Sequence, residues 1–166
     1  PIVMVGSQRS SDRPSSDAAL NLIHSVTTAA ISDIAEVMVC MFGPTSDMYG
    51  LLHRGTRVRK MHSSYRSTFR TIGDIPIATV SRDKVTPIRD DYKRRRFDND
   101  VKVNAVFDDR VAIVYYYPNM KPDMIDSLID NGYKGIVIAG TGLGHVNKPL
   151  YPALKRAKEK GVAVYM

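Results

Sequence analysis

The sequence is poor in several features that mark whole classes of protein. It contains one cysteine, Cys40, so an internal disulfide bond is ruled out, and a single cysteine fits a reducing, cytoplasmic setting. Because Cys40 lies within the apolar run EVMVCMF, we expect a small core residue rather than a ligand or a nucleophile. No apolar stretch approaches the roughly 18 residues that a membrane span needs, and no signal peptide is recognisable. The four histidines show no metal-ligand spacing, and we expect neither a metal nor a cofactor in this chain.

Length and charge set further bounds. Apolar residues make up 43% of the 166 residues, which is enough for one well-buried core or for two small lobes. The chain has 24 Lys and Arg against 17 Asp and Glu, and a net charge of +7 is compatible with a nucleic-acid partner. The sequence lacks an initiator methionine and begins and ends in strand-like runs, IVMVG and VAVYM. We therefore expect both ends to be cuts in a longer protein.

The first part of the sequence predicts a βαβ unit. Residues 2–6 form a short apolar run that ends in glycine, which is typical of a central parallel strand opening into a loop. Apolar residues then recur at helical spacing from about 16 to 31, and residues 34–42 are apolar enough for a second buried strand. The apolar stripe of the predicted helix consists of Ala19, Leu22, Ile23, Val26 and Ala30.

A different pattern follows in LLHRGTRVRKMHSS, residues 51–64. Gly55 is typical of a turn between two short arms, which predicts a β-hairpin near residues 51–62. Successive side chains of a strand point to opposite faces, so the second arm would have one face with Val58, Lys60 and His62 and another with Arg57, Arg59 and Met61.

A change in composition suggests two domains. Residues 85–102 are rich in charge and include a proline, which is typical of an exposed linker. We therefore predict one domain in residues 1–84 and a second in residues 103–166. The second domain repeats the alternation of apolar runs, at 110–118 and 135–140, with helical patterns. The predicted fold class is α/β, with parts of two lobes in which mostly parallel sheets are flanked by helices, truncated at both ends.

Two loops follow the carboxyl ends of predicted strands, where open α/β sheets bind their ligands. In the first loop, GSQRSSDRPSSD, the residues that directly follow the strand, Ser7 and Gln8, are placed to contact a substrate. The charged residues expected to hold this loop by ion pairs are Arg9, Asp12, Arg13 and Asp17. The second loop, GTGLGHVN, lacks the spacing of a dinucleotide-binding loop, so its glycines predict a tight turn instead.

Basic residues provide two further hypotheses. Lys60 shares a face with apolar Val58 and lies among arginines, which suits a lysine that takes part in proton transfer. A basic, solvated strand is the plainer alternative. The KRRR run at residues 93–96 is of a type that grips phosphates, and a solvated linker is again the alternative.

Two segments carry a resemblance to a known family. GSQRSSDRPSSDAA and HRGTRVRKMHSS resemble the D subunits of archaeal glutamyl-tRNA(Gln) amidotransferases, a tRNA-dependent branch of the bacterial-type L-asparaginase superfamily. Plain asparaginases typically carry a G-[AS]-M-R-P type sequence at the first position and a T-K-T-[HN]-T type sequence at the second. AGTGLGHV resembles the superfamily's G-T-G-N-G-N turn, with Leu143 where asparaginases often have an asparagine that helps hold the substrate.

The resemblance implies a glutaminase that removes the side-chain amide of glutamine through a threonine nucleophile. The ammonia would pass to a partner, the E subunit of the amidotransferase, which uses ATP and Mg²⁺ to convert Glu-tRNA(Gln) into Gln-tRNA(Gln), and homodimer contacts would be expected. The resemblance identifies Lys60 with the family's catalytic lysine and Ser7 with a substrate-contacting position. The family's G-G-T and H-G-T-D motifs, which hold the nucleophile and its helpers, do not occur in these residues, so this chain alone should be inactive.

Two alternatives remain open at this point. The first is a stand-alone asparaginase that acts on asparagine and needs neither tRNA nor a partner protein. The second is an RNA- or partner-binding module that uses Arg94, Arg95 and Arg96.

Overall fold

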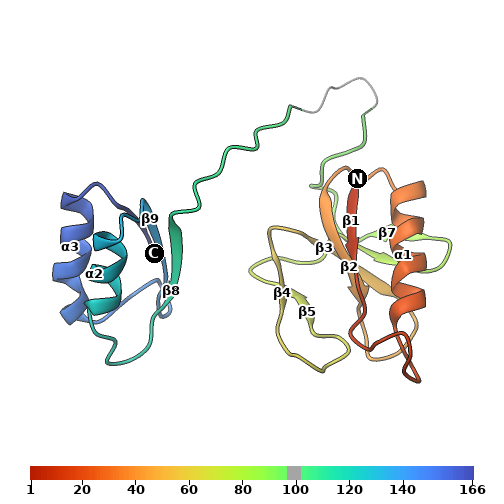
Figure 1. Ribbon diagram of the computed structural model, residues 1–166. Helices are drawn as coiled ribbons and strands as arrows, with labels where there is room; N and C mark the ends of the chain where they lie inside the picture. Colours follow the sequence, from red (N-terminus) through yellow and green to blue (C-terminus); the bar gives the residue numbers. More distant parts are fainter. Residues whose placement is uncertain (97–101) are drawn as a thin grey trace. The chain divides into compact units, whose positions relative to one another are not determined.

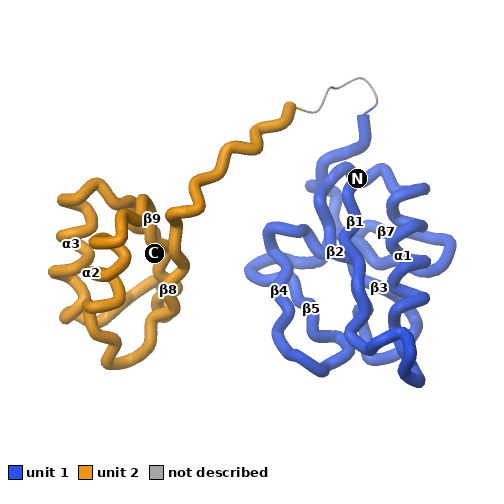
Figure 2. The backbone as a smooth tube through the Cα atoms, viewed as in Figure 1, with its two compact units in different colours: residues 1–100 blue, residues 101–166 orange. Residues whose placement is uncertain are grey.

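The structure, a computed structural model, describes residues 1–96 and 102–166. The chain divides into two compact units, residues 1–100 and residues 101–166 (Figure 2). Each unit has its own sheet and its own core of buried apolar side chains. The α/β class predicted from the sequence is confirmed.

The first unit combines one helix with strands of two sheets within its described residues (Figure 1). Its elements are β1 (Ile2–Val5), α1 (Ala18–Ile31), β2 (Val37–Phe42), β3 (Gly50–Arg54), β4 (Val58–Lys60), β5 (Phe69–Thr71), β6 (Ala78–Val80) and β7 (Val85–Pro87). The larger sheet has the order β1-β2-β3-β6-β7, and β4 and β5 form a separate two-stranded sheet.

The βαβ unit predicted at the start of the chain is present. β1 and β2 pair in parallel, from Ile2 opposite Val37 to Val5 opposite Cys40, with α1 between them in the sequence. Cys40 is fully buried, and burial raises the pKa of its thiol to about 11, as befits an inert core residue. The remaining pairs of this sheet are antiparallel, so the sheet is mixed, whereas mostly parallel sheets were expected from the sequence.

The predicted β-hairpin across residues 51–62 is wrong. A turn does follow Arg54, where the Arg57 N–H donates to the Arg54 carbonyl at 2.9 Å, but the two arms do not pair. β3 pairs with β2 and β6 in the larger sheet, while β4 pairs with β5. The physical difference is burial, because Leu52 and His53 are completely enclosed whereas β4 is basic and largely exposed.

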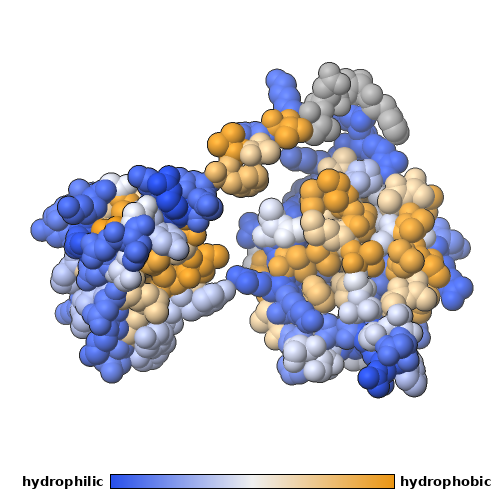
Figure 3. All heavy atoms as spheres, in the orientation of Figure 1, coloured by the Kyte–Doolittle hydropathy of each residue, from blue (hydrophilic) through white to orange (hydrophobic). Residues whose placement is uncertain are grey.

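The face that α1 turns to the sheet is polar, contrary to the usual orientation of an amphipathic helix. The buried residues of α1 are Asn21, His24, Ser25 and Thr28. The hydroxyls of Ser25 and Thr28 satisfy themselves by donating to backbone carbonyls one turn earlier, each at 2.8 Å. All five residues of the predicted apolar stripe are exposed, and Figure 3 shows apolar side chains gathered over α1 and β1.

The predicted linker begins too early. β7 pairs with β6 inside the sheet, and Tyr92 is buried in the core of the first unit with its hydroxyl donating to Asp33 at 3.0 Å. The first unit therefore extends beyond the predicted boundary at residue 84. The part of the predicted linker at residues 97–101 lies outside the described residues.

The second unit is a parallel three-stranded sheet in the order β10-β9-β8, with two helices on one face (Figure 1). Its elements are β8 (Val111–Tyr115), α2 (Asp123–Asp130), β9 (Gly135–Ala139), the short 3-10 helix η1 (Lys148–Leu150), α3 (Tyr151–Glu159) and β10 (Ala163–Tyr165). Gly132 and Gly161 follow α2 and α3 with φ values of +77° and +74°, the left-handed conformation in which glycine ends a helix.

The two-stranded sheet of the first unit is held against the larger sheet by a buried histidine. His53 on β3 lies with its Nδ1 2.9 Å from the hydroxyl oxygen of Thr71 on β5. Burial, together with the nearby positive charge of Arg70, lowers the pKa of His53 to about 4. His53 is therefore neutral at pH 7, and its protonation would place a charge in a site that water does not reach.

The folding stability is predicted to fall as the pH drops from about 6.5 to about 4. In this window the unfolded chain takes up a proton on His53, whose ordinary pKa is 6.5, whereas the folded chain does not; above it the group is neutral in both states. The loss attributable to His53 should total roughly 3 kcal/mol. Urea unfolding at a series of pH values should show a shallower pH dependence for His53→Gln, and no change for the exposed His62→Gln. Equal slopes for wild type and His53→Gln would refute this account.

The exposed apolar face of α1 is predicted to make the isolated chain self-associate. Leu22 and Val26 of α1 are 56% and 59% exposed, and β1, with Ile2 and Met4 also exposed, forms one edge of the described sheet. Sedimentation velocity should show association that increases with concentration and that the double change Leu22→Gln, Val26→Gln suppresses. Met48→Gln, which alters a side chain that is 75% exposed in the loop between β2 and β3, should leave the association unchanged. A wild-type chain that stays monomeric would contradict the prediction.

Candidate functional site

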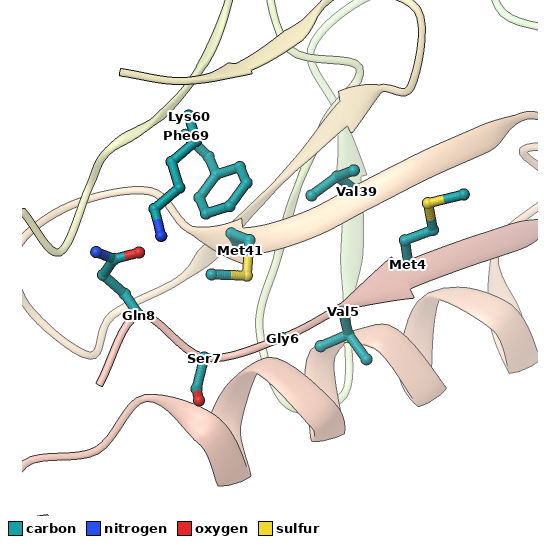
Figure 4. A pocket seen from close by; sticks show the side chains of 9 residues that line it. All are labelled: Met4, Val5, Gly6, Ser7, Gln8, Val39, Met41, Lys60 and Phe69. Atoms are coloured by element: carbon teal, nitrogen blue, oxygen red, sulfur yellow. The ribbon is translucent and has the colours of Figure 1, made fainter. Parts of the chain in front are cut away.

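A cavity of about 220 Å³ opens at the carboxyl end of β1, within the first unit (Figure 4). It is lined by Met4, Val5, Gly6, Ser7, Gln8, Val39, Met41, Lys60 and Phe69. The lining is mainly apolar, with a few polar groups brought together from two segments that are far apart in the sequence. This composition is typical of a site for a small molecule.

Lys60 reaches the cavity from the last position of β4. It pairs with Phe69 of β5, so the two side chains lie on one face of the two-stranded sheet, and both line the cavity. The opposite face carries the cross-strand pair of Arg59 and Arg70. Figure 4 shows the Lys60 amine directed toward the amide of Gln8. The residue as a whole is exposed, so the cavity remains open to solvent on this side.

Asp17 fixes the loop that forms the opposite wall. The backbone N–H of Gln8 donates to both of its carboxylate oxygens, at 3.0 and 2.9 Å, and the N–H of Arg9 donates to one of them at 2.9 Å. The amide nitrogen of Asn21 donates to Asp17 at 2.7 Å and lies 3.0 Å from the carbonyl of Gly6. Asp17 is fully buried and stands at the N-cap position of α1, yet its carboxylate serves the loop rather than the helix.

The other charged residues of this loop contribute less. The ion pair of Asp12 and Arg13 spans 3.8 Å, and its side chains are 71% and 69% exposed, so solvent screens it. Arg9 takes part through its backbone, because its carbonyl also accepts a hydrogen bond from the Ser16 hydroxyl at 2.8 Å. Of the four residues predicted to support the loop, Asp17 therefore holds the most donors.

Ser7 and Gln8 both line the cavity, but their side chains point in different directions. Figure 4 shows the Ser7 hydroxyl directed away from Lys60. The part of Ser7 that lines the cavity is therefore not its hydroxyl. The Gln8 amide nitrogen donates to the carbonyl oxygen of Ser63, which follows β4. The Gln8 carbonyl oxygen Oε1 is buried and has no hydrogen-bond partner among the described residues.

Sequence reasoning missed Asn21 and Ser63. The signal for Asn21 was present, because Asn21, His24, Ser25 and Thr28 recur at helical spacing and mark a second, polar face of α1. Ser63 acts through its backbone carbonyl, for which side-chain chemistry gives no signal.

Two arginines of the basic run at residues 93–96 are anchored to the first unit, although most of the run is exposed to solvent. Arg94 pairs with Asp33 and lies over the ring of Tyr92, with its guanidinium carbon 4.9 Å from the ring centre. Arg95 donates to the carbonyl oxygen of Ala29 at 2.7 Å. Two of the three arginines proposed for RNA binding thus have acceptors within the protein.

The glycine-rich loop of the second unit forms a tight turn, as its sequence predicts. The backbone N–H of Thr141 donates to the carbonyl of His145 at 3.0 Å, and Leu143 between them is 92% exposed. In the described part of the chain, no group of three His, Cys, Asp or Glu side chains is arranged to hold a metal ion. No helix of residues 1–96 or 102–166 combines the length and the apolar character needed to cross a bilayer.

Replacement of Asp17 is predicted to destabilise the first unit. Asp17→Ala removes the acceptor of two partly buried backbone N–H groups and of the buried Asn21 amide, which should lower the free energy of unfolding by roughly 2–4 kcal/mol. Asp12→Ala, on the same loop but exposed, should change it by less than about 0.5 kcal/mol. Chemical denaturation of the two variants gives the comparison, and similar values for both would show that Asp17 does not anchor the loop.

Comparison with known proteins agrees with these features. Residues 1–93 match the family model of the asparaginase N-terminal domain, and residues 110–166 match that of the glutaminase/asparaginase C-terminal domain. The thermostable L-asparaginase from Thermococcus kodakarensis superposes on 96% of this chain and 46% of its own, with a TM-score of 0.80 and 25% sequence identity. The asparaginase-type fold expected from the resemblance is therefore confirmed.

Several relatives carry the name that the two loop motifs suggested. The D subunits of glutamyl-tRNA(Gln) amidotransferase from Thermococcus kodakarensis and Pyrococcus furiosus are each 58% identical to this chain over its whole length. The protein of the same name from Aeropyrum pernix is 48% identical over 99% of the chain. The chain spans only 38–39% of the length of these relatives. Both family models and the full-length similarity show that this chain belongs to the asparaginase/glutaminase family.

Proposed function

We propose that the protein containing this chain is the glutaminase subunit of a tRNA-dependent amidotransferase, which releases ammonia from glutamine. The observation that carries the proposal is the Lys60 amine directed into a cavity at the carboxyl end of β1. It is supported by the similarity, over the whole chain, to proteins named as the D subunit of such an enzyme.

The cavity suits the hydrolysis of an amide. Apolar side chains such as Val39 and Phe69 shield part of it from water, which strengthens the electrostatic effect of a nearby amine. Lys60 would move a proton between the nucleophile and the departing ammonia, as a general acid and base. Ser7 would contact the substrate at the strand end, through atoms other than its hydroxyl.

The nucleophile has to come from outside this chain. Neither G-G-T nor H-G-T-D occurs in its 166 residues, and these are the motifs that hold the threonines and the aspartate of the family. We therefore propose that this chain alone is inactive. The ammonia would pass to the E subunit, which would use ATP and Mg²⁺ to amidate Glu-tRNA(Gln) in the cytoplasm, and copies of the protein would contact one another as a homodimer.

A stand-alone asparaginase is the second candidate. The fold similarity to the L-asparaginase from Thermococcus kodakarensis favours it. The first loop argues against it, because Gln8 stands where the plain asparaginase pattern has methionine. The two functions differ in substrate and in their dependence on a partner.

Ammonia release by the full-length protein that contains this chain tests the proposal. Glutamine should be preferred to asparagine, and the partner subunit with Glu-tRNA(Gln) should raise the rate. Lys60→Ala should lower kcat by about 100-fold or more. Arg59→Gln, on the opposite face of β4, should leave the rate close to wild type.

Each alternative outcome has a definite meaning. A preference for asparagine that is indifferent to partner and tRNA would establish the asparaginase function instead. Wild-type rates in Lys60→Ala would show that the reaction does not depend on the lysine in this cavity. Turnover of glutamine by the 166-residue chain alone, lost in Lys60→Ala, would show that the chain holds all the essential groups.

A further inference from the structure

The side chain of Gln8 joins two segments that are distant in the sequence. Its amide nitrogen donates to the carbonyl oxygen of Ser63, three residues after Lys60. Its backbone N–H is held by the buried carboxylate of Asp17. Gln8 therefore spans the cavity wall, from the loop after β1 to the segment that follows the lysine.

The contact with Ser63 fixes which end of the amide faces the cavity. A carbonyl oxygen can only accept, so the nitrogen of Gln8 must face Ser63 and its oxygen Oε1 must face the other way. Oε1 is buried and has no hydrogen-bond partner among the described residues. A buried acceptor left unpaired is unfavourable, so Oε1 is placed to receive a donor.

Lys60 is the suitable side-chain donor in the lining. The side chains of Met4, Val5, Val39, Met41 and Phe69 carry no N–H or O–H group. The Ser7 hydroxyl points away from the site of Lys60, whereas the Lys60 amine points toward the Gln8 amide (Figure 4). A cationic donor also forms the stronger kind of hydrogen bond with a carbonyl oxygen.

We propose that Gln8 is the positioning residue of Lys60, with its Nε2 tethering the segment after β4 and its Oε1 orienting the Lys60 amine when substrate fills the cavity. This inference rests on the proposed function and changes the role that the sequence suggested for Gln8, from substrate contact to support of the lysine. Methionine, the residue of the plain asparaginase pattern, supplies neither the donor nor the carbonyl acceptor.

The test measures kcat and KM for glutamine in the full-length protein with its partner subunit. The variants are Gln8→Met, which removes donor and acceptor, and Gln8→Glu, which keeps an acceptor but cannot donate to Ser63. Ser64→Ala is the matched control, because its exposed hydroxyl lies 3.4 Å from that of Ser63 and away from the cavity lining. Amide hydrogen exchange of residues 61–68 reports the tether separately.

Gln8→Met should lower kcat by about 10- to 100-fold with little change in KM, as expected for the loss of a hydrogen bond to a charged group. Gln8→Glu should retain more of kcat than Gln8→Met, while both variants speed exchange at residues 61–68. Ser64→Ala should match wild type in all three measurements.

Other outcomes overturn the inference. A raised KM with unchanged kcat would make Gln8 a substrate contact, and wild-type kinetics or unchanged exchange in Gln8→Met would deny it the positioning role. Lys60→Ala, measured alongside, distinguishes a failure of the inference about Gln8 from a failure of the proposed function. If Lys60→Ala abolishes ammonia release and Gln8→Met does not affect it, only the inference fails; if Lys60→Ala has no effect, the proposed function fails as well.

Discussion

The buried carboxylate of Asp17 is the interaction on which the rest of the site depends. A loop rich in serine and charge has little apolar surface with which to order itself, and its backbone N–H groups need acceptors once they are buried. Asp17 supplies acceptors for the N–H groups of Gln8 and Arg9 and for the side chain of Asn21, which in turn holds the Gly6 carbonyl. The end of β1 is fixed in this way, and the Gln8 side chain can then meet the segment that follows Lys60.

This requirement also explains the orientation of α1. The helix must place Asp17 and Asn21 against the loop, and the polar residues one and two turns further on follow on the same face. Because Ser25 and Thr28 satisfy their hydroxyls within the helix, that face can pack against the sheet without unpaired hydroxyls. The apolar stripe is left on the outside as a consequence. The same face thus serves both the cavity and the core, and the hydrophobic pattern alone does not reveal it.

Much of the architecture could be predicted from local sequence patterns, and its failures have physical causes. The apolar runs of β1, β2, β8 and β9 and the helices between them are strong periodic signals, so the α/β class and both helical regions of the second unit were correct. The prediction of a hairpin failed because strand pairing depends on burial elsewhere in the chain, which a glycine turn does not encode. The predicted start of the linker was wrong because charged residues such as Arg94 and Arg95 bind acceptors on distant parts of the first unit. For the site, period two correctly separated Lys60 from Arg59, whereas the backbone carbonyl of Ser63 lies beyond any side-chain pattern.

The central claim is that an amide substrate binds in the cavity between β1 and the two-stranded sheet, within reach of Lys60. The most direct measurement is a crystal structure of the full-length protein bound to glutamine, with the threonine that we propose as its nucleophile replaced by valine to prevent turnover. The account predicts that the side-chain amide of glutamine lies in this cavity, beside the Lys60 amine and the backbone at Gly6. Glutamine bound elsewhere, with the Lys60 amine turned to solvent, would contradict it.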